Sequence, residues 1–588
     1  MKKNRLSEAF NSMVETIKKQ TITDWTEIDV FLQTIGMEKE DNSRNTPDDY
    51  FKIIGKGIGF VTYDYGIDGV SIEIRKYAES LEGIYAKRQI NLALHFIGGE
   101  FYETADILLK PEWKRFQIDG MNGWSKWDSG TWFSKLYYED MPGGSDISKE
   151  MAVEMWKQAA GFAEKLGNYL VENNIHCLIP VNIPTNPGNF AIQLALIIVT
   201  ECMDIAVISS NHDFYWEGGK APSEKEPDEG PGVRDFFFKN IDNNPFFSLF
   251  KKMYPWNGTK WLQVNINSRQ SRKLIDTFGF NADQIFELGT AVSDEFFKPF
   301  TFEDQKLYRK KMAYILSDGF PVIKPVSVKN HLSTLESWMQ NQKPIACGFV
   351  DGLELDPSTN KTIYCLQPTR VITRKRIGMN FHLLEALLQQ DSFKSVFESD
   401  LEYQFVVHIS GPTPIEHQAD LETVLNAYID LCESIPESSA KRIFITFSVG
   451  TENHPSFAEN NLEPLSIEQI YRMATVILFP SETEGRGLPI VESSACGIPI
   501  ICSKFQPHEV FEEVVGEHLS ENERIRYLIF PEPGAALESD YLNEVTDLLI
   551  NKKKRSEWIK HNKEAVRYRY SSEMIALKFE QFETVQHL

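Results

Sequence analysis

The stretch "ETEGRGLPIVESSACGIPIIC", Glu482–Cys502, has the pattern of an α/β unit. It follows a short apolar run at Val476–Phe479, and a second apolar run lies at its end. Short apolar runs bounded by turn residues are typical of buried strands. Between them, Pro489 suits the first turn of a helix, where its missing N–H is not needed, and Gly497 suits the helix C-terminus. The pattern predicts a strand, a glycine-rich loop, a helix at 490–495 and a second strand.

The same alternation of strands and helices extends along most of the chain, after a small helical region at 1–50. It passes through a long helix at about 149–173 and a strand that ends in His212 and Asp213. It restarts after a connecting segment at 287–300. Such alternation is typical of parallel sheets wrapped by helices. We therefore expect two doubly wound α/β domains, in which ligands bind beyond the carboxyl ends of the strands.

The composition argues against several kinds of partner. The 588 residues carry a net charge of −23, with 61 Lys and Arg against 84 Asp and Glu. Nucleic acids and anionic lipids are bound by basic surfaces, so neither nucleic acid nor stable membrane association is expected. The most apolar stretch, 191–208, contains several polar residues and predicts a buried helix and strand, not a membrane span.

The N-terminus and the cysteines favour a cytoplasmic protein. The first residues lead into polar sequence and not into the apolar core of a secretory signal. The seven cysteines include no C-x-x-C pair, so neither a zinc site nor a disulfide framework is indicated. Most of them lie in apolar runs, and we expect them to be buried and reduced.

Four loops that follow predicted strands carry the residues best suited to a ligand. They are the glycine loop around Gly69, the loop at His212 and Asp213, the loop 370–375, and the loop at Glu484. Cations and helix N-termini bind diphosphates, carboxylates accept hydrogen bonds from sugar hydroxyls, and glycines let the backbone approach a ligand. This set of residues indicates a site for a nucleotide-diphosphate sugar.

Several of these motifs resemble those of retaining glycosyltransferases of family 4, which have the GT-B fold. "EGRGLPIVESSACGIPII" at 484–501 resembles the family signature E-G-F-G-L-P-x-x-E-A-x-A-C-G-x-P-V-I. "QPTRVITRK" resembles its R-x-x-x-x-K element, with Arg370 and Lys375. "GIDGVS" resembles the glycine loop of the first domain, and "GTAVSDEFFKP" resembles the interdomain segment. The resemblance implies two Rossmann-like domains that face a central cleft, here with a helical N-terminal extension.

The resemblance also implies roles for residues of the second domain. Arg370 and Lys375 would pair with the donor diphosphate and stabilise the leaving nucleotide. Glu484 would contact the transferred sugar, and Glu492 would accept hydrogen bonds from the ribose. The rest of the donor site would be formed by Gly485, Arg486, Gly487 and Leu488.

Arg486 replaces the aromatic residue that is usual in the family. Contact with phosphate or acceptor and a position in solvent both stay open for it. In the first domain, Gly69 would let the glycine loop cover the diphosphate. His212 would contact the sugar, with a structural, hydrogen-bonded histidine as the alternative. The catalytic group implied by the resemblance consists of Glu484, His212, Arg370 and Lys375.

The acceptor is expected to bind in the first domain. Candidate contacts are Asp213 and, within the tryptophan-rich segment 100–145, Trp124 and Trp127, since tryptophan stacks on sugar faces. Plain core packing is the alternative for the tryptophans. Cations for a phosphorylated acceptor would be Lys114, Arg115 and Lys126.

A helical pattern near the C-terminus places Ile575, Phe579 and Phe582 on one face. The resemblance implies that this helix returns to the first domain. The expected organisation is a first domain at 1–287, a nucleotide-sugar-binding domain at 288–565 and a returning helix at 566–588.

The expected activity is transfer of a sugar, glucose or mannose, from a UDP-, GDP- or ADP-sugar to a hydroxyl of a small soluble acceptor. The acceptor would be a sugar, a sugar phosphate or a hydroxy acid. The resemblance implies retention of configuration and no essential metal or other cofactor. The alternatives are a silent nucleotide-sugar-binding regulator, a GT-B phosphorylase or epimerase, and a transferase acting on a lipid or polysaccharide. A homo-oligomer is left open.

Overall fold

The chain forms two compact units, which are described here from a computed structural model. Unit 1 comprises Met1–Thr290 and Ser572–Leu588, and unit 2 comprises Ala291–Ser571. The expected boundary at 565/566 falls inside a helix that continues to Tyr570, so the chain leaves unit 2 only after that residue. The structure describes residues 2–37, 55, 57–66, 68–123, 132–227, 230–317, 319–320, 322–329, 343–413, 418–448 and 455–582.

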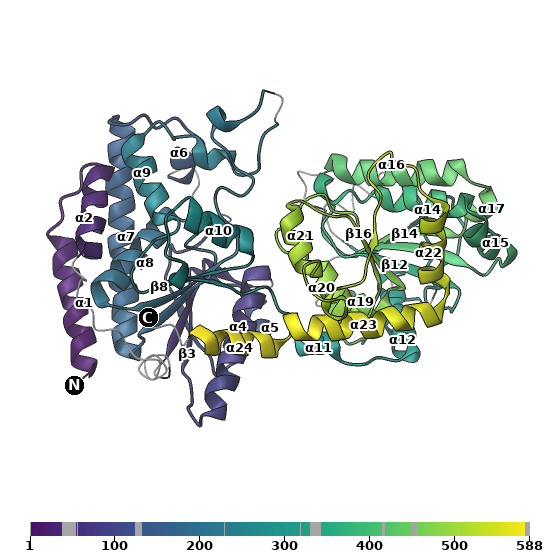
Figure 1. Ribbon diagram of the computed structural model, residues 1–588, viewed down its shortest axis with the longest axis horizontal. Coiled ribbons are helices and arrows are strands. Elements are labelled where there is room, and N and C mark those ends of the chain that lie inside the picture. Colours follow the sequence, from purple (N-terminus) through teal and green to yellow (C-terminus); the bar gives the residue numbers. More distant parts are fainter. Residues whose placement is uncertain are drawn as a thin grey trace. The chain divides into compact units, whose positions relative to one another are not determined.

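Both units are mixed α/β structures with mainly parallel sheets, as predicted (Figure 1). The sheet of unit 1 is parallel throughout and has the order β5-β3-β1-β6-β7-β8-β9. Its strands are β1 (Ile58–Val61), β3 (Leu94–Gly98), β5 (Lys114–Gln117), β6 (Cys177–Pro180), β7 (Ala206–Asn211), β8 (Trp261–Asn265) and β9 (Ile285–Glu287). A separate pair consists of β2 (Asp64–Tyr65) and β4 (Glu100–Phe101).

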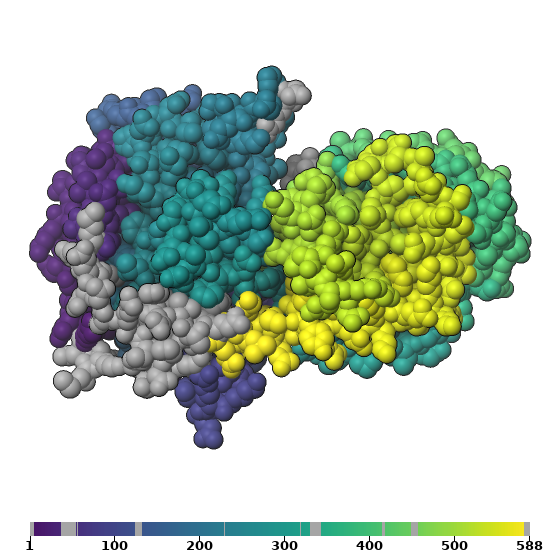
Figure 2. All heavy atoms as spheres, viewed as in Figure 1, coloured from purple at the N-terminus to yellow at the C-terminus, as the bar shows by residue number. Residues whose placement is uncertain are grey.

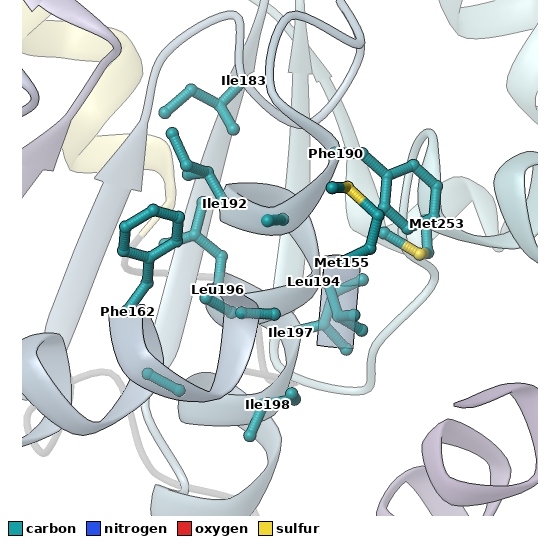
Figure 3. Packing of buried hydrophobic residues seen from close by; sticks show 14 of the residues in the cluster. Met155, Phe162, Ile183, Phe190, Ile192, Leu194, Leu196, Ile197, Ile198 and Met253 are labelled. Carbon is teal, nitrogen blue, oxygen red and sulfur yellow. The ribbon is translucent and has the colours of Figure 1, made fainter. Parts of the chain in front are cut away.

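The core of unit 1 is built around one helix, α8, whose side chains are buried at every position except Cys202. Its apolar residues pack with Met155 and Phe162 of α7 (Figure 3). The α-helices of this unit are α1 (Lys2–Lys18), α2 (Trp25–Met37), α4 (Gly69–Lys87), α5 (Ala105–Leu108), α6 (Phe133–Tyr137), α7 (Asp146–Asn173), α8 (Phe190–Met203), α9 (Asn244–Met253), α10 (Ser268–Asp276) and α24 (Ser572–Phe582). Its short 3-10 helices are η1 (Pro222–Glu224), η2 (Asp235–Phe238) and η3 (Ala282–Gln284).

The N-terminal helices α1 and α2 belong to the core of unit 1. Both contact α7 and α8, and their purple atoms form part of the outer surface of the unit (Figure 2). Trp25 is fully buried, and its ring packs edge-on against Phe190 and Phe246. Its indole N–H donates to the hydroxyl of Ser148 over 3.1 Å. The helical extension thus covers apolar faces that would otherwise be exposed.

The C-terminal helix α24 packs on α4 of unit 1. Ile575 and Phe579 are buried, and the ring of Phe579 lies 5.6 Å from that of Tyr77. The side chain of Phe582, expected on the same face, lies outside the described residues.

The sheet of unit 2 has the order β10-β11-β14-β13-β12-β15-β16-β17. Its neighbours are parallel except for β11 and β14, an antiparallel pair that the sequence did not indicate. The strands are β10 (Val326–Ser327), β11 (Ile345–Gly348), β12 (Thr362–Gln367), β13 (Gln404–Ile409), β14 (Ile443–Phe447), β15 (Val476–Phe479), β16 (Ile500–Cys502) and β17 (Leu528–Ile529).

Helices cover both faces of this sheet. Ile363 and Cys365 of β12 join the apolar cluster of α14, α16 and α22, whereas Tyr364 and Leu366 join that of α12, α19, α20 and α21. Such alternation follows from the pleat of a strand. The helices are α11 (Asp294–Phe297), α12 (Phe302–Leu316), η4 (Thr373–Lys375), α14 (Met379–Gln389), α15 (Asp391–Ser399), α16 (Gln418–Ser434), α17 (Glu437–Ala440), α18 (Pro455–Glu459), α19 (Ile467–Met473), α20 (Leu488–Cys496), α21 (His508–Val515), η7 (Glu521–Glu523), α22 (Ser539–Ile550) and α23 (Lys552–Tyr570).

We predict that Trp25→Ala destabilises unit 1 by about 3–5 kcal/mol, the usual effect of truncating a buried tryptophan. Native-state hydrogen exchange of the α8 amides measures this, because α8 lies wholly within unit 1. Val30→Ala on the same helix is the control, since Val30 is 55% exposed. The control should change the stability by less than about 0.5 kcal/mol. Equal protection of α8 in both variants would show that the extension is dispensable to the core.

Candidate active site

The loops that follow β12 and β15 lie together because these two strands are parallel neighbours. They correspond to the predicted loops at 370–375 and at Glu484. Main-chain and side-chain bonds join them: the N–H of Glu482 donates to the carbonyl of Arg374 over 2.8 Å, and the Arg374 guanidinium donates to the carbonyl of Thr483 over 2.7 Å. The carboxyl ends of β12 and β15 thus form one surface, where α/β sheets commonly bind ligands.

Lys375 and Glu484 form an ion pair between these loops. Their side chains are only 8% and 13% exposed. Burial lowers the pKa of Lys375, while the neighbouring Glu484 carboxylate opposes that shift. Two residues that the sequence analysis assigned to different parts of a donor are therefore in direct contact.

The glycine-rich loop ends in a backbone conformation that requires glycine. Gly487 has φ +60°, and a Cβ there would lie 2.9 Å from the Phe505 ring. The helix predicted at 490–495 is α20; it starts at Leu488 and ends before Gly497. Of the other loop residues, Gly485 is exposed, and Arg486 and Leu488 are half-buried. Arg486 is thus not fully in solvent.

Arg370 differs from Lys375 in being exposed, and its side chain forms no hydrogen bond or ion pair with another described residue. Its loop rests on Gly411, which follows β13. A Cβ on Gly411 would lie 2.1 Å from the carbonyl oxygen of Thr369, so no larger residue fits. Gly411 was not predicted from the sequence, although a glycine directly after a predicted strand could have indicated a close backbone approach.

Glu492 lies on α20 and is half-buried. Its Oε2 accepts a hydrogen bond of 2.6 Å from the hydroxyl of Tyr471, a buried residue of α19. Tyr471 was not predicted from the sequence as part of the site.

In unit 1, Gly69 is the first residue of α4. Asp68 caps this helix by accepting a 2.8 Å hydrogen bond from the N–H of Ser71. No described atom lies within 4 Å of the position where a Gly69 Cβ would stand. The loop is thus open at Gly69.

His212 follows β7 and is buried. Its Nε2 lies 3.3 Å from the hydroxyl of Ser210, and its carbonyl accepts a 3.0 Å hydrogen bond from Gln270. Asp213 is half-buried; its N–H donates to Asn182, and its carboxylate pairs with Arg234 at 3.3 Å. These bonds fix both residues at the carboxyl end of β7. A structural role for His212 accounts for them, and its contact with a sugar stays a prediction.

The expected acceptor residues are placed only in part. Trp124, Trp127 and Lys126 lie outside the described residues. The role of Arg115 as a cation for a phosphorylated acceptor stays a prediction. Arg115 lies on the edge strand β5, which β3, β1 and β6 separate from β7. Its neighbour Lys114 is on the same edge strand, and Arg115 itself pairs with Asp106. Two further tryptophans of the segment, Trp113 and Trp132, are buried in the core.

The described residues include neither a cluster suited to a metal ion nor a helix suited to span a membrane. They contain no group of three or more His, Cys, Asp and Glu placed to hold a metal ion. None of their helices is both long and apolar enough to cross a membrane. All seven cysteines are free thiols, and all but Cys202 are buried.

Comparison with known proteins gives a partial family match. Residues 450–565 match the model of the family "Glycosyl transferases group 1", and this part includes Glu484, Glu492 and Tyr471. A comparison with curated protein sequences gave no match.

Several solved structures align with the chain. A glycosyltransferase from Rickettsia africae ESF-5 is 13% identical, with a TM-score of 0.49, and the alignment covers 90% of this chain and 98% of that chain. WaaG, a glycosyltransferase involved in lipopolysaccharide biosynthesis, is 10% identical, with a TM-score of 0.45 and coverage of 90% and 99%. Sucrose-phosphate synthase from Thermosynechococcus elongatus is 11% identical, with a TM-score of 0.45 and coverage of 90% and 98%.

The ion pair generates a prediction about stability. Lys375→Met leaves the Glu484 carboxylate without its partner, and we expect unit 2 to lose about 2 kcal/mol, less than for a fully buried pair. The double variant Lys375→Met/Glu484→Gln should recover most of this loss, because no unpaired charge remains. Hydrogen exchange of the β12 and β15 amides provides the measurement.

The neighbouring pair of Arg376 and Glu482 is the matched control, since it joins the same two loops but is 25% and 47% exposed. Arg376→Met should cost less than about 1 kcal/mol. If the substitutions at Lys375 and Glu484 have strictly additive effects on the stability of unit 2, the two side chains have no coupling energy.

Proposed function

We propose that this protein is a retaining glycosyltransferase that uses a nucleotide-diphosphate sugar. The observation that carries the proposal is the meeting of Lys375 and Glu484, with Arg370 beside them and Glu492 on the following helix. A cation held against a carboxylate at the end of parallel strands suits a ligand with both phosphate and hydroxyl groups. The match of residues 450–565 to the glycosyltransferase family model supports it.

The donor is bound by unit 2 in this proposal. Lys375 keeps Glu484 as one partner and still has N–H groups for a diphosphate oxygen, since an ammonium carries three donors. Arg370, which is exposed, pairs with the diphosphate from its loop. Glu484 accepts from hydroxyls of the sugar, and Glu492 accepts from the ribose. The N–H groups at the start of α20 add favourable dipoles for the phosphates.

The chemical step depends on charge stabilisation. As the bond between the sugar and the phosphate breaks, negative charge grows on the leaving diphosphate, and Arg370 and Lys375 stabilise it where it forms. The acceptor hydroxyl attacks from the same face, and its proton passes to the departing phosphate oxygen. In unit 1, His212 is the candidate for contact with the sugar and Asp213 the candidate for contact with the acceptor. In this proposal the protein contributes positioning and electrostatics, and the reaction needs no essential metal.

Arg370→Ala tests the donor site directly. Because the Arg370 side chain has no partner among the described residues, its removal should leave the melting temperature unchanged. It should lower kcat/KM by a factor that corresponds to about 2–5 kcal/mol, because diphosphate charge is left unpaired. The donor is first identified from thermal shifts with UDP, GDP, ADP and their sugars, and hydrolysis and transfer are then followed.

Arg376→Ala is the control for charge on the same loop, because Arg376 pairs with Glu482. We expect it to keep kcat/KM close to that of the wild type. Equal activity of Arg370→Ala and the wild type would place the diphosphate elsewhere. Donor binding without any turnover would instead favour a nucleotide-sugar-binding regulator.

We further propose that the acceptor is small and soluble: a sugar, a sugar phosphate or a hydroxy acid. The net charge of −23 disfavours docking on an anionic bilayer. We expect no cosedimentation with anionic liposomes at physiological salt, and we expect transfer to soluble acceptors under the same conditions. Strong liposome binding combined with transfer only to lipid would contradict this prediction and would indicate a local basic patch.

A further inference from the structure

Tyr471 has a hydroxyl that donates to a side-chain carboxylate and not to the main chain. The bond joins its phenol oxygen to Oε2 of Glu492 over 2.6 Å. A buried tyrosine in the same unit, Tyr428, shows the more ordinary arrangement, since its hydroxyl donates to the carbonyl of Ile443 over 2.8 Å. Tyr471 therefore donates to a side chain, Glu492, that can also bind a ligand.

The phenol is held in place by the core. Tyr471 is 1% exposed and packs edge-on against Phe296, with the ring centres 5.9 Å apart. Burial, together with the nearby Glu492 carboxylate, raises the pKa of Tyr471 well above its usual range. The hydroxyl therefore remains protonated and acts as a fixed donor at neutral pH.

The hydrogen bond to Tyr471 is one of several that the Glu492 carboxylate can make. An ionised carboxylate offers about four acceptor sites, and the phenol occupies one of them. A glutamate has a flexible side chain, and a hydrogen bond from a rigid, buried donor favours one of its rotamers. The bond from Tyr471 provides such a restraint before any ligand arrives, which is how supporting residues keep a site in its productive geometry.

We infer that Tyr471 is a positioning residue, which fixes the Glu492 carboxylate in the conformer that accepts hydrogen bonds from the ribose of the donor. This inference rests on the proposed function, because it takes Glu492 to be the ribose contact. It goes further by assigning the selectivity for ribose over deoxyribose to a residue outside the contact with the ligand. Tyr471 acts through Glu492 and is not itself a catalytic residue.

The test compares a nucleoside diphosphate with its 2′-deoxy and 3′-deoxy analogues. The base is the one that stabilises the wild-type protein in a panel of UDP, GDP and ADP. Tyr471→Phe keeps the buried ring and removes only the hydroxyl. We expect this variant to bind the ribonucleotide about tenfold more weakly, which is the effect of losing a hydrogen bond to a charged group. Binding of the deoxy analogue that lacks the contacted hydroxyl should change much less. With the sugar donor, KM should rise and kcat should stay nearly constant, since the ribose is bound equally in ground and transition states.

Two further variants separate positioning from loss of structure. Tyr428→Phe removes a buried tyrosine hydrogen bond elsewhere in unit 2, so it should leave the preference for ribose unchanged. In Glu492→Gln the preference for ribose should already be low, and adding Tyr471→Phe should change it little further. This lack of additivity is the sign that both residues act in one contact.

The outcomes distinguish the inference from the proposed function. A wild-type protein that binds none of the nucleoside diphosphates would overturn both. Normal nucleotide binding with an unchanged preference for ribose in Tyr471→Phe would overturn only the role of Tyr471. Equal weakening of ribonucleotide and deoxy analogues would also overturn it, because it would show a general loss of structure.

Discussion

The ion pair of Lys375 and Glu484 exists only because β12 and β15 are parallel neighbours. The chain runs from β12 to β13 and β14 on one side and then returns to β15 on the other. The loops that leave β12 and β15 therefore carry the chain in opposite directions at this point. Such switch points leave an open surface at the carboxyl ends of the strands, and here that surface holds a cation and a carboxylate.

A pair this buried is not explained by stability alone. Desolvation of two charges can exceed their mutual attraction, so apolar residues of similar size are often at least as stable in such places. Burial and the nearby cations Arg374 and Arg370 together lower the pKa of Lys375. A second anion bound beside Lys375 would offset the desolvation cost of burying this cation. In the proposed reaction, that anion is the donor diphosphate.

The sequence was most informative where apolar runs and turn residues alternate. The strands and helices around Glu482–Cys502 form as predicted, because the apolar runs form buried strands and Gly497 ends the helix between them. The contact of Lys375 with Glu484 could not be predicted from the residues alone, since it depends on the order of strands that are far apart in the chain. The antiparallel pairing of β11 with β14 was missed for the same reason.

Single side chains were harder to predict than elements. Tyr471 occupies an apolar helix position, and its pattern is that of an ordinary core residue; only the path of α20 places Glu492 within reach of its hydroxyl. Arg309 is similar, because a buried cation in α12 satisfied by the carbonyl of Met473 and the hydroxyl of Thr475 has no signal in sequence spacing. Polar partners of buried groups follow from packing, which the hydrophobic pattern does not specify.

The loop after β12 is rich in cations, whereas the protein as a whole is acidic. A net charge of −23 repels an anionic ligand at long range, so a binding site for a diphosphate needs a local excess of positive charge. On the loop after β12, Lys375 and Arg376 are neutralised by Glu484 and Glu482. Arg374 donates to a neutral carbonyl, and Arg370 has no partner among the described residues. These two arginines keep the loop positive, and Arg370 alone is exposed enough to meet an incoming phosphate first.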